Sequence, residues 1–195
     1  MQSSGFPVYE KVPLARTIPP RYFRGIPTRR PKAPPEPSTT ARPTSARAKS
    51  LSVPTEQEIL DICKGGEDQL YEFKAAGTEV RKLAREICAM LNTKQGGIVF
   101  YGIDDHGKIQ GTDVPRQDLD QPLQNSIKNS ISPAATVALK SVSVLGTEVL
   151  VLVVPPWNRR DVYQFDERVL IRKGTNVFGA RPEELKKLHR GIHVV

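Results

Sequence analysis

Acidic residues at two points of the chain have the type and spacing to bind a divalent cation. Glu67 and Glu72 precede a segment with helical patterning, and Asp104 and Asp105 follow the strand-like stretch after it. If the neighbouring strands pair, these carboxylates meet at one end of a sheet. Oxygen ligands of this kind hold Mg²⁺ or Mn²⁺, which activates water and stabilises a leaving oxygen. The spacing indicates a candidate metal-assisted hydrolytic site, and the aspartate pair before Gly107 also fits ordinary turn chemistry.

Other catalytic chemistries fit the sequence less well. Residues 102–108 match Gly-x4-Gly-Lys, the start of a nucleotide-binding loop, but Ile109 stands where a Ser or Thr is needed. That loop carries two aspartates, and a predicted strand rather than a helix follows it, which argues against ATP binding. The three histidines and two cysteines lack the spacing of zinc ligands. No Gly-x-Ser-x-Gly elbow of a serine hydrolase is present.

Helical periodicity surrounds the acidic residues. Thr55 followed by Glu58 is a capping-box pattern at the start of a helix. Apolar residues recur at steps of three and four between residues 78 and 92. The predicted helices run from Thr55 to Gly65, from 78 to 92, from 119 to 131, and onward from Pro182.

Strand patterns occupy most of the remaining sequence. They predict strands at 70–74, 98–103, 108–111, 137–145, 149–154, 161–165 and 168–173. The third is expected to form a hairpin with the second, and the last two to form a hairpin around Asp166-Glu167. The fold class is α+β, with a mostly antiparallel sheet and packed helices over residues 53–192.

Residues 1–50 differ in composition from the rest of the chain. They contain ten of the 17 prolines and ten of the 29 basic residues, but only two of the 21 acidic residues. We interpret them as a disordered, basic, Pro-rich tail. Arg21-Tyr22-Phe23-Arg24 within it could dock on a protein partner or stack on bases, and the alternative is a solvated linker. Residues 51–195 carry equal numbers of basic and acidic groups, so nucleic-acid binding there requires a local patch.

The two cysteines and the hydropathy indicate a cellular location. Cys63 and Cys88 lie in helical apolar patterns and are expected to be free core thiols, which fits a reducing compartment. No stretch has the roughly 20 apolar residues of a membrane span. We therefore expect an intracellular, cytoplasmic protein. A mitochondrial or nuclear location is the alternative, because the N-terminus is rich in arginine and poor in acids, as transit peptides are.

Several motifs together resemble the Schlafen-type divergent Alba-like domain. The resemblance covers roughly residues 55–190. In the first half of this range, the matching motifs are Gly66-Glu67 with Glu72-Phe73-Lys74, residues 87–93, Gly96-Gly97 with residues 100–105, and residues 107–111. In the second half, they are Ile131-Ser132-Pro133, residues 153–156, and residues 169–176 followed by a Pro-Glu-Glu-Leu helix.

This resemblance implies a function. Nuclease members of that family cut structured RNA such as tRNA at a metal-dependent site of three carboxylates. These fall on Glu67, Glu72 and Asp105, with Asp104 as the alternative to the last. The implied activity is an Mg²⁺- or Mn²⁺-dependent endoribonuclease, or the catalytic subunit of one that processes structured RNA or small-RNA precursors. Single-copy relatives that bind nucleic acid or act as scaffolds provide the alternative.

The resemblance also suggests partners. Vertebrate Schlafen nucleases combine two such domains to grip RNA, so one copy is expected to pair with a second as a homodimer or heterodimer. Basic and aromatic side chains could contact the RNA, or could simply be solvated surface groups. The candidate nucleic-acid-binding residues are Lys74, Trp157, Arg159, Arg160, Arg172 and Lys173.

Overall fold

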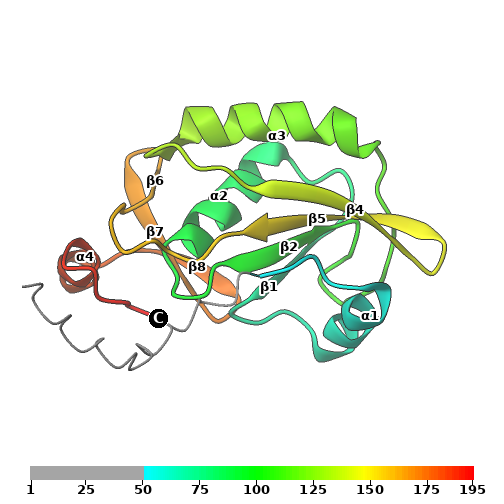
Figure 1. The fold of residues 1–195 in the computed structure, drawn as a ribbon, viewed down its shortest axis with the longest axis horizontal. Coiled ribbons are helices and arrows are strands. Elements are labelled where there is room, and N and C mark those ends of the chain that lie inside the picture. Colours follow the sequence, from blue (N-terminus) through cyan, green and yellow to red (C-terminus); the bar gives the residue numbers. More distant parts are fainter. Residues whose placement is uncertain (1–50) are drawn as a thin grey trace, which may run out of the picture. The chain divides into compact units, whose positions relative to one another are not determined.

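The computed structural model describes residues 51–195, which form two four-stranded sheets and four α-helices (Figure 1). The basic tail predicted at residues 1–50 lies outside the described part of the chain. Within residues 51–195, no helix is both long enough and apolar enough to cross a membrane.

The first sheet forms the centre of the domain. Its strands lie in the order β1 (Tyr71–Lys74), β2 (Gly97–Tyr101), β5 (Thr147–Val154) and β4 (Ala138–Val144). β1 and β2 run parallel, and the other neighbouring pairs are antiparallel. Because β1 and β2 are parallel, their C-terminal ends lie at the same end of the sheet. β1 is an edge strand, so one side of its backbone is free to contact the loop that precedes it.

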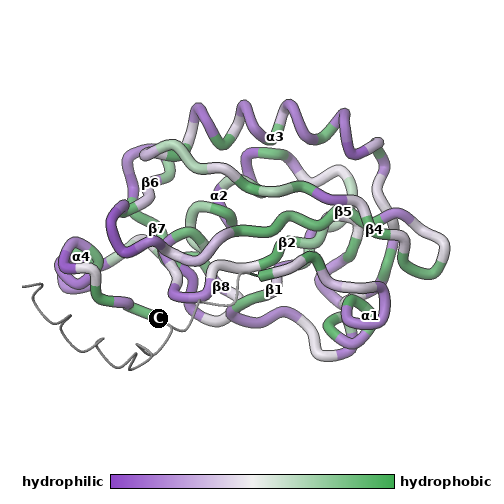
Figure 2. The backbone as a smooth tube through the Cα atoms, viewed as in Figure 1, coloured by the Kyte–Doolittle hydropathy of each residue, from purple (hydrophilic) through white to green (hydrophobic). Residues whose placement is uncertain are grey.

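Helices cover both faces of this sheet. α2 (Val80–Leu91) and α3 (Arg116–Ser130) pack on one face, and α1 (Glu56–Gly65) packs on the other. β2 is buried throughout because its side chains point alternately into the two hydrophobic cores, one on each face of the sheet. Val99 and Tyr101 face α2 and α3, whereas Ile98 and Phe100 face the α1 side. The hydropathy of the chain follows this arrangement, since β2 and β5 are apolar and α3 is largely hydrophilic outside its buried positions (Figure 2).

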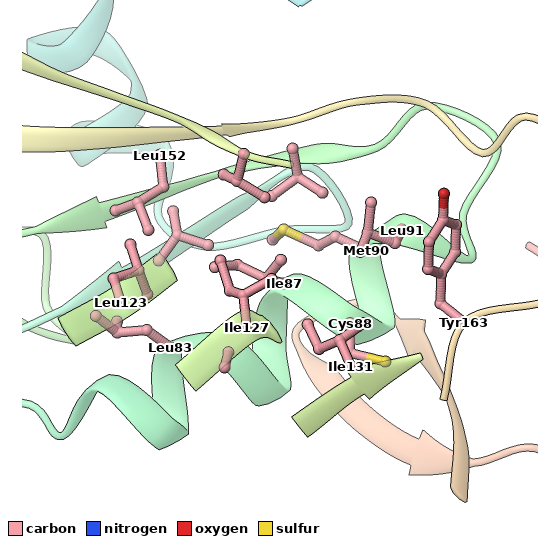
Figure 3. Packing of buried hydrophobic residues seen from close by; sticks show 14 of the residues in the cluster. Leu83, Ile87, Cys88, Met90, Leu91, Leu123, Ile127, Ile131, Leu152 and Tyr163 are labelled. Atoms are coloured by element: carbon pink, nitrogen blue, oxygen red, sulfur yellow. The ribbon is translucent and has the colours of Figure 1, made fainter. Parts of the chain in front are cut away.

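The larger core lies between the two covering helices and the sheet. Leu83 and Ile87 of α2 lie beside Leu123 and Ile127 of α3, together with Leu152 of β5 (Figure 3). All five side chains are almost completely buried. Apolar residues at helical spacing on two helices thus explain why both lie against the same face.

The second sheet packs at one end of α2. It contains β3 (Ile131–Ser132), β6 (Gln164–Phe165), β7 (Arg168–Lys173) and β8 (Asn176–Gly179), all paired antiparallel. α4 (Pro182–His189) follows it and begins with a proline in its first turn, as predicted.

The structure confirms the predicted fold class and corrects several elements. The capping box of Thr55 and Glu58 is present at the start of α1. The strand predicted at 108–111 is wrong, because only one bridge, between Ile103 and Ile109, connects this stretch to the end of β2. The helix predicted at 119–131 begins earlier and ends at Ser130, and the strand β8 was not predicted.

Candidate functional site

The loop before β1 fixes the first predicted acid. The carboxylate of Asp68 accepts hydrogen bonds from the N–H groups of Leu70 and Tyr71, at 2.7 and 2.9 Å, and so closes the loop. Oε1 of Glu67 accepts a hydrogen bond of 2.7 Å from the N–H of Phe73. The Glu67 carboxylate is therefore held along the free edge of β1 and is half-buried.

Glu72 is the buried acid of the site. Adjacent residues of a strand point to opposite faces of the sheet, and Phe73 faces α1, so Glu72 faces α2. Glu72 is only 4% exposed. Lys74 forms an ion pair with one oxygen, and Nη1 of Arg172 lies 2.6 Å from the other. That second oxygen, Oε2, has no hydrogen bond of acceptable geometry within residues 51–195, so its contact with Arg172 is purely an ion pair.

Arg172 connects the second sheet to the acids. Its side chain is fully buried. Nη2 donates hydrogen bonds to the carbonyls of Asp68 and Tyr71, at 2.7 and 3.0 Å, and Nη1 contacts Glu86 of α2 at 3.4 Å. One guanidinium therefore contacts two buried acids and satisfies two carbonyls, one in the loop that carries Glu67 and one at the start of β1.

Glu86 is a buried acid that sequence reasoning missed. Burial raises the pKa of its carboxyl, and the charge of Glu72 raises it further. A signal was present in the sequence, because Glu86 lies three residues after Leu83 and four before Met90, on the apolar side of α2. A charged residue at such a position suggests a buried partner.

Asp104 and Asp105 differ in their surroundings. The carboxylate of Asp104 accepts hydrogen bonds from the N–H groups of His106 and Lys108, at 3.0 and 2.9 Å, which makes it a turn-forming residue. The bond from Lys108 is the main cause of its lowered pKa. Asp105 is exposed. It is therefore the better placed of the two for contacting a ligand.

Glu67 responds to the charges of the other two predicted acids. Burial raises the pKa of Glu67 above the ordinary value, and the negative charges of Glu72 and Asp105 raise it further. Charge effects of this kind fade with distance, so Glu72 and Asp105 each lie in the neighbourhood of Glu67. Glu67 comes from the loop before β1, Glu72 from β1 and Asp105 from the turn after β2.

The residues present fit a hard divalent cation in their chemistry. They offer carboxylate oxygens, and the charges of Glu72 and Asp105 raise the pKa of Glu67, as expected where negative charge is in excess. Within the described residues, no three His, Cys, Asp or Glu side chains stand at metal-binding spacing. Lys74 and Arg172 contact the two oxygens of Glu72 in this conformation.

Two predicted nucleic-acid contacts need correction. Arg172 is completely buried among Glu72, Glu86 and backbone carbonyls, so its guanidinium is not presented to a ligand. Trp157 is only 4% exposed, and its Nε1 donates a hydrogen bond of 2.5 Å to the carbonyl of Asp161. Its ring packs against the ring of His193, and the two ring centroids are 5.4 Å apart. Trp157 therefore packs inside the structure rather than stacking on a base.

The other predicted basic residues reach solvent to different degrees. Lys74 is mostly buried and paired with Glu72, and Lys173 pairs with Glu184 at 2.5 Å. Arg159 and Arg160 are exposed on the loop after β5, where Nε of Arg159 donates to His193 at 3.1 Å. Lys74 is thus the only one of these four with a direct contact to a predicted acid within residues 51–195.

The substitution Arg172→Met tests the role of the buried guanidinium. Methionine fills part of the space but leaves Glu72 and Glu86 without their shared cation. Removing one partner of a buried ion pair costs about 3–5 kcal/mol, which corresponds to a fall in melting temperature of roughly 10 °C. Thermal unfolding measures it. Arg160→Met, at an exposed arginine, should shift stability by less than about 0.5 kcal/mol. Equal melting temperatures for the two variants would contradict this role.

The substitution Glu67→Gln tests the cost of holding a charged Glu67 carboxylate in the fold. Because burial, and further the charges of Glu72 and Asp105, raise the pKa of Glu67 in the folded protein, the charged form destabilises the fold above the ordinary pKa of 4.5. Glutamine keeps the acceptor for the N–H of Phe73 and removes the charge. We expect this variant to melt higher than wild type at about pH 7 and equally at about pH 3, where Glu67 is protonated in both the folded and the unfolded state of wild type. Glu167→Gln, at an exposed turn, should show no such difference, and a lower melting temperature for Glu67→Gln at neutral pH would refute this cost.

Two solved structures illustrate what the chain is similar to. One similar solved structure is the DIP2311 protein from Corynebacterium diphtheriae, with 25% identity and a TM-score of 0.50, covering 65% of this chain and 25% of that one. Another is the N-terminal domain of a putative ATP-dependent DNA helicase RecG-related protein from Nitrosomonas europaea, with 19% identity and a TM-score of 0.46, covering 53% of this chain and 74% of that one. The chain thus corresponds to a quarter of DIP2311. Curated proteins gave no match.

The family model described as "Schlafen, AlbA_2" matches residues 67–180, from the first predicted acid to the end of the second sheet. That range is more than half of the chain and contains Glu67, Glu72, Asp105 and Arg172. The chain therefore belongs to the Schlafen AlbA_2 family.

Proposed function

We propose that this chain is a metal-dependent endoribonuclease, or the catalytic subunit of one, acting on structured RNA or small-RNA precursors. The observation that carries the proposal is the half-buried Glu67 carboxylate, whose pKa is raised by burial and further by the negative charges of Glu72 and Asp105, which come from two other segments. A cluster of acids with excess charge is a common feature of cation sites in phosphodiester-cleaving enzymes.

In this proposal Glu67, Glu72 and Asp105 hold Mg²⁺ or Mn²⁺. When bound, such a cation activates water and stabilises the leaving oxygen of a phosphodiester. Glu67 is oriented by the N–H of Phe73, and Glu72 is oriented by Arg172 from the buried side. Lys74 lies beside Glu72, where its ammonium could move to a substrate phosphate.

A second candidate function is a non-catalytic nucleic-acid-binding or scaffolding subunit. The observation that favours it is the pairing of Glu72 with both Lys74 and Arg172. Two cations already balance Glu72 and Glu86, so the buried acids have a structural explanation that involves no metal. The two functions differ in whether the carboxylates matter for RNA cleavage or only for folding.

The substitution Asp105→Asn separates these functions. Asp105 is exposed, and asparagine preserves its size, so folding should be unaffected. Losing a group that only orients a metal ligand lowers metal affinity or activity by about 10–100-fold. Asp105 is proposed as a ligand itself, so we expect cleavage with Mn²⁺ to fall by at least about 100-fold. RNA binding should persist or tighten, since repulsion of phosphate is relieved. Cleavage of labelled structured RNA by the full chain, with and without copurified partners, is the measurement.

Asp118→Asn, an exposed acid at the start of α3, is the matched control and should cleave like wild type. Full cleavage by Asp105→Asn, or activity that ignores Mn²⁺ and EDTA, would exclude the metal-nuclease function. Glu72→Gln should also abolish cleavage. It is a poorer test because it leaves the charge of Arg172 less balanced.

We also propose that the active species contains two Schlafen-type domains, from two copies of this chain or from a related partner. The charge of residues 51–195 supports this, because a formally neutral domain exerts little long-range attraction on RNA. A second domain would add contacts on the other side of an RNA helix. Light scattering under cleavage conditions should detect a particle larger than one chain. Full activity from a strictly monomeric particle would contradict this assembly.

A further inference from the structure

A pocket separate from the acids lies between α2 and the second sheet. Its volume is about 510 Å³, within the range of small-ligand sites. Two cross-strand pairs make its floor, Phe165 with Arg168 and Leu170 with Gly179. Strand residues two apart face the same side, so Arg168 and Leu170 share the face that α2 covers. The pocket is lined by Arg85, Phe165, Asp166, Arg168, Leu170 and Gly179.

The absence of a side chain at Gly179 keeps this pocket open. A Cβ atom added there would meet no heavy atom within 4 Å, and Gly179 is not among the glycines with positive φ. Neither backbone conformation nor close packing therefore requires glycine at this position. Any larger residue would project into the pocket beside Leu170.

Three arginines surround the pocket with unequal pairing. Arg81 and Arg85 are four residues apart on α2, where like charges repel. Arg81 is compensated, since it pairs with Asp166 and lies over the ring of Phe165 at 5.3 Å. Within residues 51–195, the polar contacts of the Arg85 side chain are long, at 3.4 Å to Glu86 and 3.3 Å to the carbonyl of Val177. Arg168 is exposed, and its side chain has no ion pair or hydrogen bond within residues 51–195.

We propose that this pocket binds one nucleotide of the RNA strand, with its phosphate between Arg85 and Arg168. Two guanidinium groups that approach from different elements suit a phosphate, which accepts paired N–H donors. Phe165 and Leu170 supply the apolar surface on which the base or ribose rests. The RNA strand comes from the proposed nuclease function, on which this inference rests.

The pocket is placed to hold RNA near the acids. Arg168 and Arg172 lie on the same face of β7 and are four residues apart, a distance of about 13 Å along a strand. Arg172 contacts Glu72 directly. A nucleotide in the pocket would therefore keep the adjoining strand within reach of Glu72 and its neighbouring acids without occupying their site.

Binding of a short fluorescein-labelled single-stranded RNA to the full chain tests the proposal. Anisotropy measured in EDTA reports binding without cleavage. Arg168→Ala removes an exposed, unpaired charge, so we expect about tenfold weaker binding from the loss of one charged contact. The dependence of log affinity on log salt should become shallower by about 0.7 for one lost phosphate contact on a single strand.

Three further variants make the test specific. Arg116→Ala, an exposed arginine on α3, removes the same charge elsewhere and should bind like wild type. Gly179→Val fills the pocket without altering charge and should weaken binding and lower the salt dependence. Phe165→Leu keeps an apolar side chain but removes the ring, so binding should weaken with the salt dependence unchanged. Thermal unfolding checks that each variant folds.

The outcomes separate this site from the nuclease function. Weaker binding by Arg168→Ala and Gly179→Val, but not by Arg116→Ala, supports the pocket even if wild type fails to cleave RNA. Equal binding by Arg168→Ala, Gly179→Val and wild type overturns the pocket even if wild type cleaves RNA in an Asp105-dependent way. No measurable binding of the RNA by wild type also overturns it.

Discussion

The buried guanidinium of Arg172 is the interaction on which the arrangement of the site depends. It lies on β7 of the second sheet, yet its partners are in the loop before β1, on β1 itself and on α2. Charged side chains are stable in such surroundings only when paired and hydrogen-bonded. The second sheet therefore positions Glu72 by direct contact and Glu67 through the carbonyl of Asp68. Gln69 adds to this connection, because its side chain donates to the carbonyl of Arg172 and accepts from the N–H of Gly174.

Local pattern was sufficient to predict much of the fold. The apolar spacing of α2, the capping box at Thr55 and the proline of α4 all report short-range physics that operates wherever the segment lies. The errors occurred where tertiary contact decides. Ile131 continues the spacing of α3, but pairing with Phe165 makes it the start of β3. β8 is four residues long and mostly exposed, so neither alternation nor burial marks it in the sequence.

The sequence indicated which acids belong to the candidate site better than it indicated which side chains contact them. Glu67, Glu72 and Asp105 stood out as acids near strand ends, and their electrostatic proximity fits that placement. Arg172 looked like a surface group because arginines are mostly exposed, and Trp157 because it lies close to Arg159 and Arg160 in the sequence. Their burial follows from contacts with distant segments, which a single sequence does not specify. Glu86 was detectable only as a charge at a helix position whose neighbours are apolar.

The acids are more numerous than folding alone requires. The charge of Glu72 raises the pKa of both Glu67 and Glu86, and that of Asp105 raises the pKa of Glu67, whereas Lys74 and Arg172 are the two cations that contact Glu72. The raised pKa values of Glu67 and Glu86 mean that their charged forms oppose folding at neutral pH. Proteins retain such unfavourable clusters chiefly where function needs them. An added positive charge would oppose both of these costs, which is the physical basis of the proposed cation site.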